Sequence, residues 1–166
     1  YWEEALRQDS NYLPAHRWMG VLYYDLGAMD LSIVHLSVVS KLAPKDPRPD
    51  RLMGLMNRDY ERPEVAIPHY VESLKRAPNQ PDADQVRFEL AECHYKLREY
   101  DKSLEVLKLC QGSPKHQLLK ARCLLNTGAL DESRTLASAV LSQETKPSVD
   151  SLQLNAEIAL ADGNPK

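Results

Sequence analysis

The sequence is poor in the features that mark membrane proteins and cysteine-stabilised proteins. Its apolar runs are all far shorter than the roughly 20 residues that a bilayer-spanning helix requires, which argues against a transmembrane segment. Only three cysteines occur, Cys93, Cys110 and Cys123, and none belongs to a CxxC pair, so neither a disulfide framework nor a zinc ribbon is indicated. We expect these residues to be reduced and buried in the core, with a disulfide or a reactive thiol as the alternatives.

Catalytic and cofactor-binding motifs are lacking as well. The chain contains no HExxH, P-loop, GxSxG or GxGxxG motif. Its five histidines never pair at the spacing of metal ligands, and acidic pairs such as Asp131-Glu132 stand among lysines and arginines, as is typical of a solvated helix face. We therefore predict no catalytic residue, no metal site and no cofactor, and we predict that the chain is not an enzyme.

The overall charge and composition are ordinary. A net charge of −3 does not indicate a partner of strong opposite charge, so we expect neither nucleic acid nor a membrane surface as a ligand. The chain opens with YWEEALRQDS, without a methionine or a signal peptide, and we interpret it as a piece of a longer protein. We expect a soluble protein and favour the cytoplasm among the compartments.

What the sequence does contain is an internal repeat. A small residue recurs at separations of 34, 37, 30 and 35 residues, at Gly20, Gly54, Ala91, Ala121 and Ala156. Twelve residues after each of the first four lies a second small residue, at Ser32, Ala66, Ser103 and Ser133. Two registers that keep the same spacing through changes of length indicate a genuine repeat.

Each repeat unit is predicted to be two helices joined by a short turn. Apolar residues recur three and four apart from Leu13, and Gly27 then ends the first helix. The second helix runs from about Met29 to Ala43 and ends before Pro44. Further pairs are expected at 48–60 with 63–76, at 82–97 with 100–111, and at 114–127 with 130–143, followed by a last helix at 148–162.

This pattern resembles the tetratricopeptide repeat (TPR), a helix–turn–helix unit of 34 residues. The pairs Met19-Gly20 and Met53-Gly54 carry the resemblance on the first helices, and a proline closes the first two repeats. The family's early tryptophan-type position departs from the pattern, because it is polar in all four repeats: His16, Asp50, Arg87 and Gln117. The resemblance implies an all-α fold, a right-handed α-solenoid of stacked antiparallel helix pairs (a TPR superhelix).

We predict a single TPR solenoid over residues 1–166. Residues 1–10 would end the second helix of a preceding repeat, and residues 148–163 would form the first helix of a further one. Four repeats lie between them, at 13–46, 47–80, 84–113 and 114–147, of which the third is short.

The small residues of the two registers are predicted to be helix-packing positions. Helices whose axes lie 8–10 Å apart need a small side chain where they approach most closely. A glycine inside a helix costs about 1 kcal/mol against alanine, so close packing is its expected compensation. The helix-packing positions are Gly20, Ser32, Gly54, Ala66, Ala91, Ser103, Ala121 and Ser133.

The family resemblance further implies that the first helix of each unit lines a concave groove. The residues expected to face a partner there are Arg17, Trp18, Val21, Tyr24, Arg48, Arg51, Leu55, Arg58, Phe88, Glu92, Tyr95 and Arg122. Tryptophan, tyrosine and arginine are typical of binding hot spots, and the arginines of the second repeat favour an acidic segment or a terminal carboxylate. The chaperone-binding carboxylate clamp of the family is absent in its familiar form, because Val21 and Leu55 stand where that clamp needs asparagines.

The leading hypothesis is a non-catalytic protein–protein interaction scaffold that binds a peptide or protein segment in the groove. One alternative is self-association through open solenoid ends, with Trp2, Leu152, Leu154 and Ile158 as contacts. Another is a substrate-docking arm of an enzyme whose catalytic domain lies outside this chain. RNA binding through related 35-residue repeats is disfavoured by the 34-residue step and the negative charge.

Overall fold

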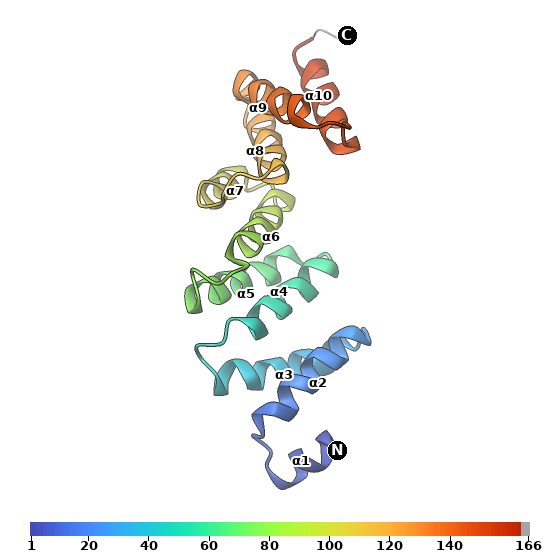
Figure 1. Ribbon diagram of the computed structural model, residues 1–166, viewed down its shortest axis with the longest axis vertical. Coiled ribbons are helices and arrows are strands. Elements are labelled where there is room, and N and C mark those ends of the chain that lie inside the picture. Colours follow the sequence, from blue (N-terminus) through green and yellow to red (C-terminus); the bar gives the residue numbers. More distant parts are fainter. Residues whose placement is uncertain (164–166) are drawn as a thin grey trace. The chain divides into compact units, whose positions relative to one another are not determined.

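The computed structural model describes residues 1–163, and within this range it consists of α-helices without any strand (Figure 1). The ten helices are α1 (Trp2–Gln8), α2 (Leu13–Asp25), α3 (Met29–Leu42), α4 (Arg48–Asp59), α5 (Pro63–Arg76), α6 (Ala83–Lys96), α7 (Tyr100–Leu107), α8 (Pro114–Asn126), α9 (Leu130–Gln143) and α10 (Val149–Ala161). They form two compact units, one covering Tyr1–Val86 and one that begins at Arg87, inside α6. None of the described helices is long and apolar enough to cross a membrane.

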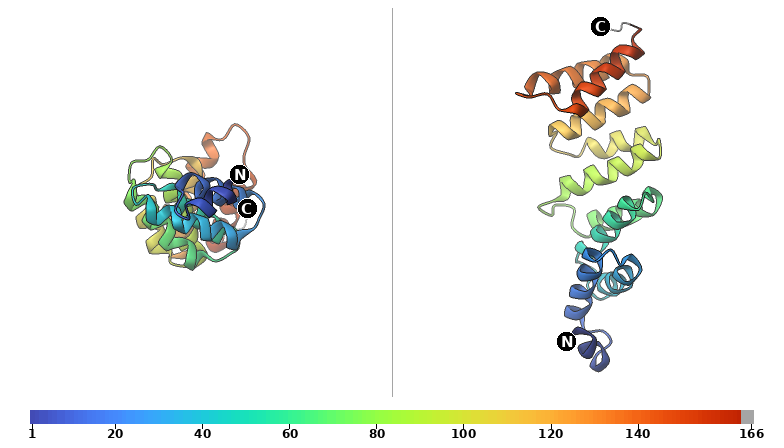
Figure 2. Two further views of the ribbon diagram at one scale, coloured as in Figure 1. Left: turned by 90° about the horizontal axis from the view of Figure 1, so that it is seen from below. Right: turned by 90° about the vertical axis from the view of Figure 1, so that its right-hand side faces the viewer.

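Consecutive helices pair within each unit, as Figures 1 and 2 show. In the first unit α2 packs along α3, α4 packs along α5, and α3 joins the two pairs by packing against α4. In the second unit α8 packs along α9, α7 contacts α8, and α10 covers both α8 and α9. The all-α fold of stacked helix pairs that the repeat predicts is thereby confirmed.

The helix boundaries agree with the sequence-based expectation to within two residues except in α7. This helix ends at Leu107, whereas the apolar pattern predicts a helix to residue 111. Leu109 and Cys110 instead bond back by three residues, to the carbonyls of Val106 and Leu107, and the chain then leaves the helix. The second helices α3, α5 and α9 have 14 residues each against 8 in α7, so the third repeat is short in its second helix.

The turn inside each helix pair depends on one residue with left-handed backbone. Glycine takes this position at Gly27 (φ 70°) and Gly128 (φ 84°). The same position is occupied by Glu61 (φ 55°) in the second pair and by Arg98 (φ 60°) in the third. Because a side chain in this conformation is strained by roughly 1–2 kcal/mol, these two turns are less favourable than the others.

Replacing Arg98 with glycine should therefore raise the free energy of unfolding by about 0.5–1 kcal/mol. The relief of backbone strain exceeds the entropy that glycine adds to the unfolded chain. Urea denaturation measures the change. Lys120→Gly, at an exposed position inside α8, is the control and should lose about 1 kcal/mol, because that backbone is ordinary helix. A loss of stability in Arg98→Gly would contradict the assignment of strain.

The small residues of the two registers meet at the centre of each helix pair. The buried hydroxyl of Ser32 donates to the carbonyl of Gly20 at 2.7 Å. Ser103 and Ser133 make the same bond to the carbonyls twelve residues before them, at 2.9 and 2.8 Å. In the second repeat Ala66 stands opposite Gly54 and has no hydroxyl. The serines therefore fix one helix against the other in addition to leaving room for close approach.

Gly20 and Gly54 also lie against a large side chain of the opposing helix, in addition to the small residue twelve positions later. A Cβ added at Gly20 would lie 2.8 Å from Cδ2 of Leu36, and one at Gly54 would lie 2.8 Å from Cε1 of Tyr70. Leu36 and Tyr70 are both buried on the second helix of their pair. The space that each glycine leaves is thus filled by an apolar side chain of the opposing helix.

The polar residues at the early tryptophan-type position of the first two repeats are buried and bonded. In the first repeat His16 Nδ1 lies 2.9 Å from His35 Nδ1, and His16 Nε2 lies 3.0 Å from the carbonyl of Ser10. Because a carbonyl oxygen can only accept, His16 donates to it through a proton on Nε2. In neutral His16 the Nδ1 atom is then an acceptor, and His35 Nδ1–H donates a hydrogen bond to it. The ring of Tyr23 stacks on His35 with centroids 5.6 Å apart.

In the second repeat the equivalent residue is Asp50, which lies in a buried ionic cluster. Its carboxylate accepts from Ser40 Oγ at 3.1 Å and faces Arg76 Nε at 3.3 Å, with His69 Nδ1 at 3.8 Å. Arg76 also donates to the carbonyl of Ser40 at 3.0 Å and to Glu72 Oε1 at 3.1 Å. The cluster links α3, α4 and α5 through polar contacts. It occupies the position at which the TPR pattern has a large apolar side chain.

The histidine pair makes stability depend on pH in a defined window. Burial, and secondarily the neighbouring His16, lower the pKa of His35 below its ordinary value of 6.5. The unfolded chain therefore binds more protons than the folded chain near that pH, and stability is lost as the pH falls below about 6.5. We expect a lower urea midpoint at pH 5.5 than at pH 7.5 for the wild type. His35→Gln should shrink this difference, and an unchanged difference would contradict the role of His35.

Candidate functional site

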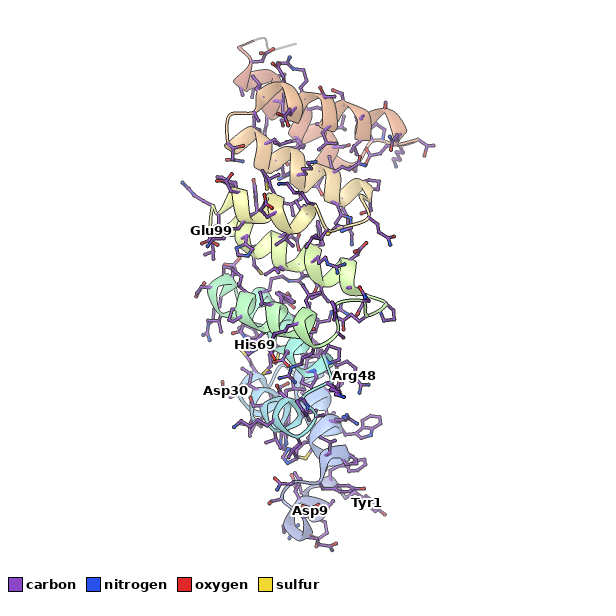
Figure 3. The ribbon with its side chains drawn as sticks, turned by 90° about the vertical axis from the view of Figure 1, so that its left-hand side faces the viewer. Tyr1, Asp9, Asp30, Arg48, His69 and Glu99 are labelled. Carbon is purple, nitrogen blue, oxygen red and sulfur yellow. The ribbon has the colours of Figure 1, made fainter. Side chains whose placement is uncertain are left out.

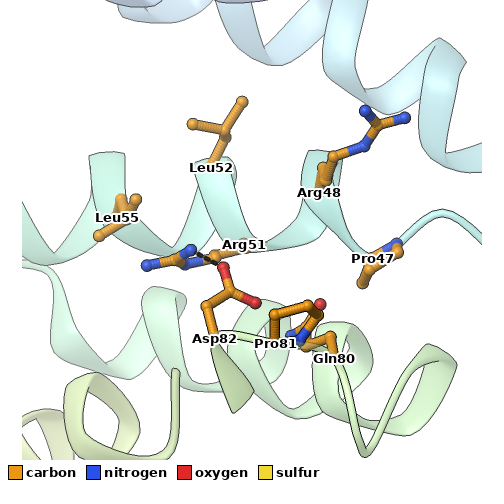
Figure 4. A pocket seen from close by; sticks show the side chains of 8 residues that line it. All are labelled: Pro47, Arg48, Arg51, Leu52, Leu55, Gln80, Pro81 and Asp82. Atoms are coloured by element: carbon orange, nitrogen blue, oxygen red, sulfur yellow. Dashed lines mark hydrogen bonds and ion pairs between the residues drawn. The ribbon is translucent and has the colours of Figure 1, made fainter. Parts of the chain in front are cut away.

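A pocket of the first unit lies along α4. Its volume is about 660 Å³, and its walls are mainly apolar (Figure 4). One wall is α4 itself and the other is the connection between α5 and α6. The lining residues are Pro47, Arg48, Arg51, Leu52, Leu55, Gln80, Pro81 and Asp82.

An ion pair crosses this pocket. Arg51 on α4 pairs through Nη1 with the carboxylate of Asp82, which immediately precedes α6, and Figure 4 shows the two side chains meeting between the walls. The side chain of Asp82 is 42% exposed and that of Arg51 is 25% exposed. The acid is therefore the outer member of the pair.

A smaller pocket of about 130 Å³ adjoins the first and shares Arg48 and Leu52 with it. Arg17 and Val21 of α2 line its other side, and Asp46 lies in the connection between α3 and α4. We call these two adjoining pockets together the first-unit groove.

Asp46 holds two arginines of the first-unit groove. Its carboxylate accepts from Arg48 Nε and Nη2, both at 2.8 Å, and from Arg17 Nη2 at 3.0 Å. The hydrogen bonds of Arg48 lower the pKa of the Asp46 carboxyl, and Asp46 in turn raises the pKa of Arg48. One carboxylate against two guanidinium groups leaves this cluster with a charge of +1.

The burial order in this cluster is opposite to that of the Arg51–Asp82 pair. The side chain of Asp46 is only 9% exposed, whereas those of Arg17 and Arg48 are 43% and 73% exposed. Arg48 projects from the surface of the first unit (Figure 3), on the side of α4 away from Asp82 (Figure 4). Asp46 thus lies beneath its arginines and leaves them facing outward.

The second unit has a pocket of its own, of about 320 Å³. It is lined by Phe88, Glu92, Tyr95, Lys96, Lys115, Leu118, Leu119, Arg122 and Asp150, which come from α6, α8 and the start of α10. Lys115 Nζ lies 4.8 Å above the ring of Phe88, and Arg122 Nη2 lies 3.6 Å from Asp150 Oδ1. This pocket carries aromatic rings and charges of both signs.

The structure brings nine of the twelve residues expected to face a partner into these three pockets. They are Arg17, Val21, Arg48, Arg51 and Leu55 in the first unit and Phe88, Glu92, Tyr95 and Arg122 in the second. The remaining three, Trp18, Tyr24 and Arg58, lie outside these pockets.

Each of these three residues has a different neighbour. Trp18 is 62% exposed and stacks on Trp2 with ring centroids 6.3 Å apart, since it points about 100° away from Arg17 around α2. Tyr24 packs against the apolar cluster around Leu36, between the two helix pairs. Arg58 bonds to its chain neighbour, the carboxylate of Asp59, at 2.9 Å.

Two residues that were expected to form contacts between copies of the chain lie in the core of the second unit instead. Leu154 and Ile158 are buried against Ala121 and Ala137 inside the second unit, so they are not available at an open end. Leu152 remains 51% exposed on the same helix.

Four residues that complete the first-unit groove were not predicted from the sequence: Asp46, Pro47, Pro81 and Asp82. They lie in connections between helices, where the apolar period carries no information. One signal was present, because Pro47 and Pro81 are 34 residues apart and each stands just before the first helix of a repeat.

Within the part of the chain that the structure describes, no group of three or more histidine, cysteine or acidic residues is arranged to hold a metal ion. The three cysteines are free thiols, and burial raises the pKa of Cys123. The pockets offer apolar walls and ion pairs.

Known proteins match part of this chain in sequence and most of it in fold. A tetratricopeptide-repeat family model matches residues 58–115. No curated protein sequence matches the chain. Among solved structures, MamA (residues 41 to the end) from Desulfovibrio magneticus RS-1 matches with a TM-score of 0.81 at 13% identity, covering 92% of this chain and 86% of that one.

Two further structures match over almost the whole chain. YrrB, described as a TPR protein with an unusual peptide-binding site, has a TM-score of 0.79 at 15% identity, with 99% and 85% of the two chains covered. PilW, a widely conserved type IV pilus biogenesis factor, has a TM-score of 0.73 at 20% identity, with 98% and 76% covered. These likenesses show the fold, which is that of an α-solenoid of stacked helix pairs. Residues 58–115 thus match the tetratricopeptide-repeat family that the sequence pattern predicts, and scaffolds of this type are in general non-catalytic.

Proposed function

We propose that this chain binds a peptide segment of a partner protein in the first-unit groove and prefers a segment with acidic side chains. The observation that carries the proposal is the pocket of about 660 Å³ on α4, whose apolar walls stand between arginines. A pocket of this size accommodates one or two large apolar side chains. YrrB, which shares the fold, is described as having a peptide-binding site, and this supports a peptide as the kind of ligand.

The contacts divide between apolar and charged parts of the ligand. An apolar side chain would enter between Leu52, Leu55 and Pro81. A carboxylate beside it would bind the outward donors of Arg17 and Arg48. Arg48 directs Nε and Nη2 at Asp46, and its Nη1 has no partner among the described residues, so that a second carboxylate can bind without displacing the first.

Charge reversal of Arg48 tests the proposal. Peptides are selected from a random display library against the whole chain, and their affinity is measured by fluorescence polarisation. We expect Arg48→Glu to weaken binding by about 2 kcal/mol, roughly 30-fold, because it replaces an exposed hot-spot cation with a repelling charge. Lys41→Glu, an equal reversal on the exposed side of α3, is the control and should change the affinity less than about 3-fold. Equal losses in the two variants would contradict binding in the groove.

Self-association is the alternative function, and light scattering over a concentration series separates it from peptide binding. An increase in mass that Leu152→Glu abolishes, with no peptide selected by the library, would favour it over the groove. If the chain instead docks substrates for a catalytic domain outside it, the substrate segment would bind in the same groove. The peptide measurement above is therefore also the first test of that hypothesis.

A further inference from the structure

The two acids of the first-unit groove stand on opposite sides of their arginines. Asp46 lies beneath Arg17 and Arg48 and is almost fully covered, while those guanidinium groups face outward. Asp82 lies over Arg51 and is more exposed than the arginine it pairs with. Both are aspartates, both belong to connections between helices, and both pair with arginines that line one or both pockets of the first-unit groove.

We infer that Asp82 is a specificity-determining residue, which competes with a ligand carboxylate for Arg51, whereas Asp46 presents Arg17 and Arg48 to the ligand. This inference rests on the proposed binding of an acidic peptide. It assigns opposite effects to two residues of equal charge.

The competition follows from geometry. A ligand entering the pocket reaches Asp82 before Arg51, because the carboxylate is the outer member of the pair. A ligand carboxylate gains at Arg51 only what the departing Asp82 loses, so the net gain at that arginine is small. At Arg17 and Arg48 no exchange is needed. The acidic side chain of a ligand is therefore recognised by Arg17 and Arg48 at the Asp46 cluster. Asp82 prevents a second ligand carboxylate from gaining affinity at Arg51.

Asp46 acts by holding two long side chains in place. Arg48 makes a two-point contact with Asp46, and Arg17 shares the same carboxylate. Without this anchor both guanidinium groups gain rotamer freedom, which a ligand would have to remove on binding. The positive charge of the groove rises by one in Asp46→Asn and in Asp82→Asn alike, so net charge alone predicts the same effect for both.

The test compares these two variants in the whole chain. The probe is a fluorescein-labelled peptide with the sequence Gly-Leu-Glu-Glu-Leu-Gly and an amidated C-terminus, which provides only side-chain carboxylates. We expect Asp82→Asn to lower the Kd at least about 5-fold and Asp46→Asn to raise it at least about 3-fold. The same peptide with glutamine in place of glutamate should bind Asp82→Asn and wild type within about 2-fold of each other. A version with a free C-terminus shows whether a terminal carboxylate replaces the side chains.

The outcomes separate this inference from the proposed function. If wild type binds the probe and both variants lower the Kd equally, the net charge of the groove alone determines affinity and the inference is overturned. It is overturned as well if Asp82→Asn binds no more tightly than wild type. If wild type and both variants retain their helical circular dichroism but bind neither the probe nor any library peptide, the proposed function fails and the inference fails with it. Binding by Asp82→Asn alone supports both.

Discussion

Replacing Arg76 with methionine should lower the free energy of unfolding by about 3 kcal/mol. Arg76 and Asp50 are almost fully buried, with Arg76 Nε 3.3 Å from Asp50 Oδ2. Methionine keeps much of the volume but leaves the Asp50 carboxylate buried without its main counter-charge. Removing one partner of a buried pair costs more than the pair contributes, because the other charge remains desolvated.

Chemical denaturation of matched variants measures this effect. Arg7→Met removes an arginine from the exposed pair with Glu4 and should cost less than about 1 kcal/mol. The double variant Asp50→Leu with Arg76→Met should regain most of the loss, since no charge is then left unpaired. If Arg76→Met lost no more stability than Arg7→Met, Asp50 and Arg76 would not form a buried ion pair.

Gly54→Leu should destabilise the first unit by about 2–3 kcal/mol through overpacking. Even the first carbon of a side chain at Gly54 would lie 2.8 Å from Cε1 and 2.9 Å from Cδ1 of Tyr70. Tyr70 is fully buried, so its rigid ring has little space in which to withdraw. The gain in helix propensity over glycine, about 1 kcal/mol, offsets only part of this cost.

A comparison of two glycines checks the cause. Gly20→Ala meets the flexible end of Leu36, whereas Gly54→Ala meets an aromatic ring, so the second variant should lose more stability. In a double-mutant cycle Tyr70→Ala should make Gly54→Ala less harmful, because it removes the clashing ring. Additive losses in this cycle would contradict direct contact at the Gly54 position.

The helices were predictable because their determinants are local. The turn at Gly27, the small residue at Gly20 and the apolar period before it lie within one short stretch of chain, and they sufficed to place α2. The end of α7 was not predictable in this way. Leu109 and Cys110 continue the apolar period, but their amides bond three residues back and the chain turns toward α8.

The candidate site was predictable only on the helices. Arg17, Arg48 and Arg51 follow from their places on first helices, but their partners Asp46 and Asp82 lie in connections, where no periodicity relates one residue to the next. Proximity across 29 and 31 residues is a product of the folded chain. The polar residue at Asp50 was visible as a departure from the family pattern, while its partner on α5 was not.

The serine hydrogen bonds between paired helices have a mechanical consequence for the second helix pair. A hydroxyl at mid-helix prevents axial sliding in the first, third and fourth pairs, and Ala66 supplies none. In the second pair the bonds gather at one end instead, where Ser73 Oγ donates to the carbonyl of Pro47 at 3.0 Å and Arg76 meets Asp50. The axial register of α4 on α5 is thus set at two places: beside Pro47 and Arg48, at the edge of the pocket, and at the Glu61 turn, where Arg62 N donates to the carbonyl of Asn57 at 2.8 Å.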